Sequence, residues 1–121
     1  MTAALEIKNL AIRLPESRTG RLRTVINDVS LCLDQGESLG LVGSSGCGKT
    51  TCARAALRLL IPSAGSVHVN GTDLAALPRK SLRQFRRHMQ MVFQDPGGSL
   101  NGRMRAGDLV AEPMVVHGLA S

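Results

Sequence analysis

The sequence has 121 residues, enough for at most one domain with a real core, and 43% of them are hydrophobic, as in an ordinary globular protein. Three cysteines without CxxC spacing argue against a disulfide framework and a zinc site, and they fit a reducing cytoplasm. No apolar run approaches the ~18 residues of a membrane span, and Glu6 and Lys8 near the start do not suit a signal peptide. We therefore expect a cytoplasmic protein, unless a partner holds it at a membrane.

The net charge of +6 comes from one part of the chain. Residues 79–105 contain seven bases and one acid, whereas the remaining residues contain eight bases and eight acids. Such a block can bind nucleic acid or another anionic surface. Because no aromatic residues are interleaved for base stacking, nucleic acid is not an expected partner. We prefer a solvated basic helix face beside a phosphate site, and nucleic-acid binding remains an alternative.

The first half of the chain predicts strands, then a glycine loop and a helix. Loose alternation of apolar residues predicts strands over 5–14 and 24–33. A short apolar strand is expected over 38–42, directly before the glycine loop. The run over 49–61 is rich in Ala and Leu and predicts a largely buried helix that ends before Pro62.

The second half predicts short elements that alternate. Asn70-Gly71 is a strong signal for a tight turn after a strand, and Pro113 should bend or break a late helix. The expected elements are strands over 66–70 and 90–93, helices over 78–88 and 106–117, and a loop over 95–102. Strands first, followed by alternating strands and helices, indicate an α/β core with an antiparallel edge.

The stretch "GSSGCGKTT" predicts a phosphate-binding loop between a strand and a helix. Its glycines let the backbone turn so that successive N–H groups face one anion, and the helix N-terminus adds further donors. Lys49 is expected to reach the β- and γ-phosphates, and the Thr50 hydroxyl to bind Mg²⁺. The predicted nucleotide-binding residues are Gly43, Ser44, Ser45, Gly46, Cys47, Gly48, Lys49, Thr50 and Thr51.

Two polar residues follow the apolar run "MVF" and suggest different chemistries. Gln94 could place an amide near the phosphate loop and orient a water molecule. Asp95 could instead hold Mg²⁺, as in another phosphate-loop enzyme such as a small kinase. Because Gln94 stands between the apolar run and Asp95, we prefer the first interpretation. The three histidines have no spacing suited to metal binding.

Two stretches carry a resemblance to one family. "SLGLVGSSGCGKTT", after "INDVSLCLDQGE", resembles the start of the ABC transporter ATPase domain. "MQMVFQDPGGSLNGRMRAGDLVAEPMVVHG" resembles the glutamine-loop region of the oligopeptide, dipeptide and nickel importer branch. The resemblance implies a partial P-loop NTPase core of the α/β class with an N-terminal antiparallel β subdomain, and ATP and Mg²⁺ as cofactors. It also implies that Gln94 is catalytic and that Gln94 and Thr50 contact the metal.

The resemblance further implies an organisation, partners and a location. The chain would be the N-terminal part of one ATP-binding domain in an importer for peptides or a similar solute. Its parts would be antiparallel strands (1–37), the P-loop strand and helix (38–61), a strand, basic helix and glutamine loop (66–105), and the start of a helical subdomain (106–121). The partners would be a second ATP-binding subunit and transmembrane permease subunits, on the inner face of the cell membrane.

The chain departs from the family pattern in three ways. The region from Arg18 to Arg23 lacks the aromatic residue that usually stacks on adenine. Gly97 and Gly102 stand where the importer branch usually has an aromatic residue and a proline. The family's signature motif and Walker B aspartate do not occur in the sequence. We therefore expect this chain alone to be marginally stable and without significant ATPase activity, and a nucleotide-binding module without turnover remains the alternative.

Overall fold

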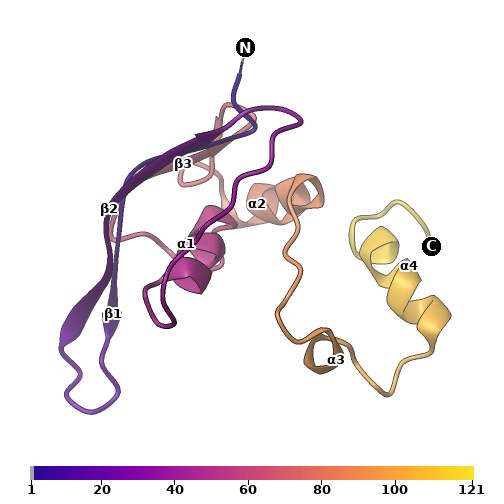
Figure 1. The fold of residues 1–121 in the computed structure, drawn as a ribbon. Coiled ribbons are helices and arrows are strands. Elements are labelled where there is room, and N and C mark those ends of the chain that lie inside the picture. Colours follow the sequence, from indigo (N-terminus) through magenta and orange to yellow (C-terminus); the bar gives the residue numbers. More distant parts are fainter. Residues whose placement is uncertain (1) are drawn as a thin grey trace. The chain divides into compact units, whose positions relative to one another are not determined.

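The computed structural model describes residues 2–121, and the chain divides into two compact units (Figure 1). The first unit ends at Pro78, and the second unit comprises Arg79–Ser121. No helix within the described residues is long and apolar enough to cross a membrane.

The first unit is built on a four-stranded antiparallel sheet in the order β2-β1-β3-β4. Its strands are β1 (Leu5–Pro15), β2 (Leu22–Leu33), β3 (Ala64–Val69) and β4 (Thr72–Asp73). The two long strands expected over 5–14 and 24–33 are confirmed, and β2 begins two residues earlier than predicted. Ile7, Leu10 and Ile12 of β1 all face the core, where each is almost completely buried. Leu10 and Ile12 alternate regularly, whereas a bulge between Ile7 and Leu10, at Asn9 with its φ of 48°, brings Ile7 to the same face.

The tight turn predicted at Asn70-Gly71 joins β3 to β4. Both residues have positive φ, 49° at Asn70 and 78° at Gly71, as a two-residue type I′ hairpin turn requires. Val69 and Thr72 pair directly across it. The side chain of Asn70 also accepts a hydrogen bond from Gln35 Nε2 at 2.7 Å. This part of the fold could therefore be read from two adjacent residues.

The helix α1 (Lys49–Ala56) follows the glycine loop and contacts β2. It ends five residues before the predicted end at Ile61, and only Cys52 and Ala55 are buried along it. The prediction of a largely buried helix is therefore wrong. Cys52 and Ala55 are three residues apart and form one narrow buried stripe, whereas Thr50, Ala53 and Arg54 are exposed.

Two predicted strands do not form. The segments 38–42 and 90–93 have no strand pairing, and Val42 and Val92 are 96% and 92% exposed. A strand needs a neighbouring strand to satisfy its backbone hydrogen bonds. Within residues 2–121 neither segment has such a neighbour, so the apolar pattern alone does not make a strand. The sheet of the described residues is antiparallel throughout.

The second unit consists of short helices: α2 (Arg79–Phe85), the 3-10 turn η1 (Arg86–His88), α3 (Pro96–Ser99) and α4 (Ala106–Val116). The helix expected over 78–88 is confirmed, although its last turn is 3-10. The expected loop over 95–102 contains α3, because the Asp95 carboxylate accepts a hydrogen bond from the Gly98 N–H at 3.2 Å. The helix α4 continues through Pro113 and is not broken there.

Candidate phosphate-binding site

The base of the glycine loop is fixed by Gly48, the N-cap residue of α1. Its φ of 105° lies in the region that favours glycine. A Cβ at this position would lie 2.7 Å from Cδ1 of Ile26 and 3.3 Å from the carbonyl oxygen of Val25. Glycine is therefore required both by the backbone conformation and by the close approach to β2. This contact sets where α1 begins relative to the sheet.

A second close contact lies within the loop itself, between Gly43 and the side chain of Cys47. A Cβ on Gly43 would lie 2.6 Å from Sγ of Cys47, so a larger residue at position 43 would displace the cysteine. The Cys47 N–H donates to the carbonyl oxygen of Ser44 at 3.2 Å. The loop thus forms a small ring of backbone, and its residues up to Cys47 are exposed to solvent.

The side chain of Lys49 folds back over this ring. Its Nζ donates to the carbonyl oxygens of Gly43 and Ser44 at 2.6 and 2.8 Å, and it lies 3.5 Å from Sγ of Cys47. An ammonium group has three donors and no acceptor. The positive charge is therefore held over the mouth of the loop by neutral carbonyl groups.

The N-terminus of α1 adds further donors to the same place. The first N–H groups of an α-helix have no acceptor within the helix, and no side chain caps α1 at Gly48. The first turn also carries no acidic residue. These N–H groups and the partial positive charge of the helix end favour an anion. Together with Lys49 they form a site suited to phosphate.

The structure brings residues 43–51 of the predicted site together, whereas Gln94 belongs to the second unit. Gln94 is exposed and lies in a bend before α3. Its role beside a nucleotide stays a prediction. Asp95, the alternative metal ligand, has a local structural role because its carboxylate caps α3.

The cysteines of this region have different environments. Cys47 is exposed in the loop, whereas Cys52 is buried on α1 with 5% of its surface exposed. Burial raises the pKa of the Cys52 thiol, because the thiolate is poorly solvated there. Cys52 is therefore a packing residue, and Cys47 is the thiol that reagents can reach at the site.

Sequence reasoning did not indicate the role of Arg58, which lies two residues after the end of α1. It follows α1 with a φ of 50°, a conformation that usually indicates glycine at the end of a helix. An arginine carries no local signal for such a turn. The unusual conformation becomes visible only in the structure.

Comparison with known proteins agrees with this geometry. The sequence model of the ABC transporter family matches residues 26–113, which include the whole glycine loop and Gln94. This match covers more than half of the chain, so the chain belongs to the ABC transporter family.

Three relatives of the chain are named as ATP-binding proteins for peptide, oligopeptide or dipeptide transport. A probable peptide ABC transporter ATP-binding protein of Sinorhizobium fredii is 53% identical over 89 residues, covering 74% of this chain and 25% of the relative. A putative oligopeptide transport ATP-binding protein of Bacillus subtilis is 44% identical over 117 residues, covering 95% and 35%. A dipeptide transport ATP-binding protein of Lactococcus lactis is 45% identical over 117 residues, covering 95% and 37%. The chain thus spans between 25% and 37% of the length of these relatives.

Proposed function

We propose that the chain supplies the phosphate-binding part of an ATP-binding subunit in an ABC importer for peptides or a similar solute. The observation that carries the proposal is the convergence of Lys49 and the uncapped N-terminus of α1 on one small loop. The names of the relatives support peptides as the class of solute. Bound ATP would supply the phosphoanhydride bond whose hydrolysis drives import.

The residues of the loop suit a triphosphate in both charge and shape. Backbone N–H groups from Ser44 to Thr51 would donate to phosphate oxygens. Lys49 would exchange the two carbonyl oxygens that it now contacts for oxygens of the β- and γ-phosphates. This exchange favours the bound state because a phosphate oxygen carries negative charge, so the ammonium then bonds to an opposite charge and not to a neutral carbonyl. Thr50 would give its hydroxyl to Mg²⁺, and Thr51 would contact the α-phosphate.

Gln94 is the proposed catalytic residue. Its amide would orient the attacking water and contact the Mg²⁺ ion held by Thr50. The exposed side chain of Gln94 is accessible for this role. A small kinase that uses Asp95 on Mg²⁺ is the less favoured alternative, because the carboxylate already accepts the Gly98 N–H.

The proposal extends to the fold of the complete ATP-binding domain. The exposed apolar segments 38–42 and 90–93 would pair there as strands of an α/β core. Residues 1–37, whose strand β1 pairs with β3, would form the antiparallel subdomain together with β3 and β4, and residues 106–121 the start of the helical subdomain. The complete protein would act with a second ATP-binding subunit and with transmembrane permease subunits, on the cytoplasmic face of the membrane.

Equilibrium binding of MgATP to the purified chain tests this function. Lys49→Ala should weaken binding by about tenfold or more, since a hydrogen bond to a charged group contributes about 1.5–3 kcal/mol. Lys80→Ala removes an exposed lysine from α2 and serves as the matched control, with unchanged affinity expected. Equal affinity of the wild type and Lys49→Ala would contradict the proposal.

A further inference from the structure

The helix α1 ends with an arginine in a conformation that glycine usually supplies. The Arg58 N–H donates to the carbonyl oxygen of Ala55 at 2.9 Å, and the Leu59 N–H donates to that of Arg54 at 2.8 Å. This pair of hydrogen bonds is the Schellman motif, whose central residue is left-handed. Arg58 occupies that position with a φ of 50°. The conformation is unfavourable for a residue with a Cβ, so the side chain is expected to compensate.

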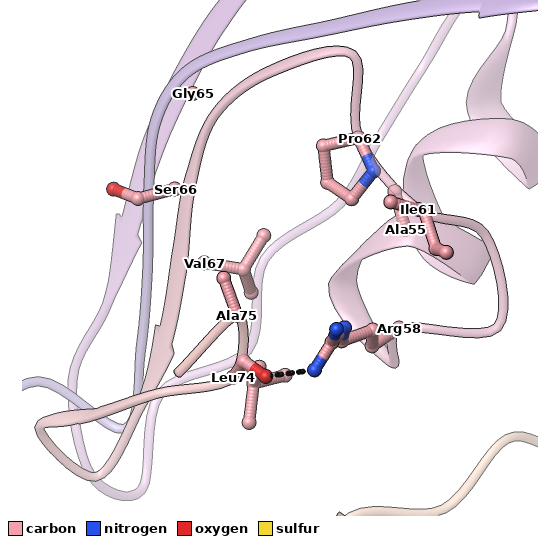
Figure 2. A pocket seen from close by; sticks show the side chains of 9 residues that line it. All are labelled: Ala55, Arg58, Ile61, Pro62, Gly65, Ser66, Val67, Leu74 and Ala75. Atoms are coloured by element: carbon pink, nitrogen blue, oxygen red, sulfur yellow. Dashed lines mark hydrogen bonds between the residues drawn. The ribbon is translucent and has the colours of Figure 1, made fainter. Parts of the chain in front are cut away.

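The side chain of Arg58 makes such a compensating contact. Its guanidinium donates to the carbonyl oxygen of Leu74, and to that of Leu77 at 3.3 Å, in a partly buried position. Figure 2 shows Arg58 extending from the end of α1 toward Leu74. A planar guanidinium with several donors suits two neighbouring carbonyl groups. Arg58 therefore connects the end of the helix to the segment that follows β4.

The connected segment is itself anchored to the sheet. Leu74 is 1% exposed, and its N–H donates to the carbonyl oxygen of Val67 on β3 at 3.0 Å. Leu77 is followed by Pro78, the last residue of the first unit. Arg58 thus joins α1 to a fixed point of the sheet, at the place where the chain leaves this unit.

A pocket lies beside this connection, between the end of α1 and β3, and its walls include Ala55, Ile61 and Val67 as well as Arg58 (Figure 2). Ala55 and Leu74 are almost completely buried, so the end of α1 also has apolar contacts with the core. The guanidinium of Arg58 adds directed hydrogen bonds to this packing.

We propose that Arg58 is a positioning residue for the phosphate site. The helix α1 has eight residues and is therefore only about 12 Å long. Because Gly48 holds the N-terminal end against β2, fixing the C-terminal end as well sets the direction in which the N-terminal N–H groups point. Arg58 would thus keep these donors aimed at the loop without touching the nucleotide. This inference rests on the proposed binding of MgATP.

Three substitutions of Arg58 separate the effect of its guanidinium hydrogen bonds from the effect of its left-handed backbone conformation. Arg58→Ala loses the guanidinium and keeps the unfavourable left-handed residue, whereas Arg58→Gly loses the guanidinium but suits that conformation. Arg58→Lys keeps a charged donor. Arg54→Ala is the matched control, because Arg54 is an exposed base on the same helix.

We expect Arg58→Ala and Arg58→Gly to weaken MgATP binding to a similar extent, by about threefold to tenfold. Arg58→Gly should unfold at a higher denaturant concentration than Arg58→Ala, since the backbone strain is relieved. Arg58→Lys should recover part of the affinity, and Arg54→Ala should bind like the wild type. Wild-type affinity in Arg58→Gly, or an equal loss in Arg54→Ala, would overturn the proposal.

Hydrogen exchange tests the connection independently of nucleotide. The backbone amides of Leu74 and Ala75 should exchange about tenfold faster in Arg58→Ala and Arg58→Gly than in the wild type, and Arg58→Lys should lie between. If the wild type failed to bind MgATP while these amides behaved as expected, the proposed function would fail and the connection would stand. Unchanged exchange at both amides would overturn the connection itself.

Discussion

The Nζ atom of Lys49 lies 2.6 Å from the carbonyl oxygen of Gly43, six residues earlier in the chain. The side chain of Lys49 therefore lies against the loop that is proposed to bind phosphate, and it places its ammonium group there. A phosphate oxygen has to take the place of these carbonyl acceptors. The hydrogen bonds of Lys49 to these carbonyl groups therefore place its ammonium group at the phosphate site.

Lys49→Ala should weaken MgATP binding with little effect on the stability of the fold. The hydrogen bonds of Lys49 are solvent-exposed, so we expect the free energy of unfolding to fall by only about 1 kcal/mol or less. Chemical denaturation in the absence of nucleotide measures this change. A loss of several kcal/mol would mean that Lys49 is chiefly a structural residue.

Gly48→Ala should destabilise the first unit. The new Cβ would meet Ile26 Cδ1 at 2.7 Å, and the φ of 105° would be strained for alanine. We expect a loss of about 1–3 kcal/mol in the free energy of unfolding. Gly40→Ala is the matched control, because nothing lies within 4 Å of a Cβ built there. Equal stability of the two variants would show that the contact between the loop and β2 is not required.

Alkylation should distinguish the loop thiol from the helix thiol. In a Cys32→Ser background, a thiol reagent should modify exposed Cys47 and leave buried Cys52 unmodified in the folded chain. The added group would fill the loop beside Gly43, so nucleotide binding should be lost and MgATP should protect the thiol. Mass spectrometry and a binding titration measure both effects. Normal MgATP binding by fully modified chain would contradict this account.

The stability of the first unit should decrease at alkaline pH. Burial raises the pKa of Cys52 above its ordinary value of 9.0, so the unfolded chain releases this proton at lower pH than the folded chain does. The contribution of the neutral thiol is complete below pH 9.0 and is lost as the pH rises through the raised pKa.

Denaturation midpoints measured across this range test the effect. Cys52→Ala should show a weaker alkaline loss than the wild type, whereas Cys32→Ala, which removes an exposed thiol, should keep it. If Cys52→Ala had the same alkaline profile as the wild type, the buried thiol would not be its source.

Replacing Gln94 and Asp95 separately by alanine tests the assignment of the glutamine loop. Asp95→Ala should remove the cap of α3 and cost about 1 kcal/mol locally, with Mg²⁺-dependent ATP binding retained. Gln94→Ala should leave the cap intact and weaken the Mg²⁺ dependence. If Asp95→Ala abolished that dependence and Gln94→Ala did not, the chain would use Asp95 as its metal ligand, as the kinase alternative requires.

Sequence patterns alone predicted the elements whose pairing partners lie nearby in the chain. The strands β1 and β2 pair with each other, and Asn70-Gly71 closes its own turn, so alternation and turn chemistry predicted them. The segments 38–42 and 90–93 depend on a neighbouring strand that local sequence cannot supply. The helix α3 escaped prediction because two glycines obscured the start signal Asp95-Pro96.

The phosphate site also has a part that the sequence predicted and a part that it did not. The spacing from Gly43 to Thr50 predicted the loop, because glycine and lysine have specific conformational and chemical roles there. The position of Arg58 depends on the carbonyl groups of Leu74 and Leu77, which are distant in sequence. Contacts of that kind become apparent only when the chain is folded.

One measurement tests the central claim most directly: a calorimetric titration of the wild-type chain with ATP and with AMP, both in the presence of Mg²⁺. The loop offers its donors and Lys49 to the β- and γ-phosphates, which AMP lacks. We predict that ATP binds at least about tenfold more tightly than AMP, from one or more charge-assisted hydrogen bonds. Equal affinity for the two nucleotides, or binding of neither, would contradict the account.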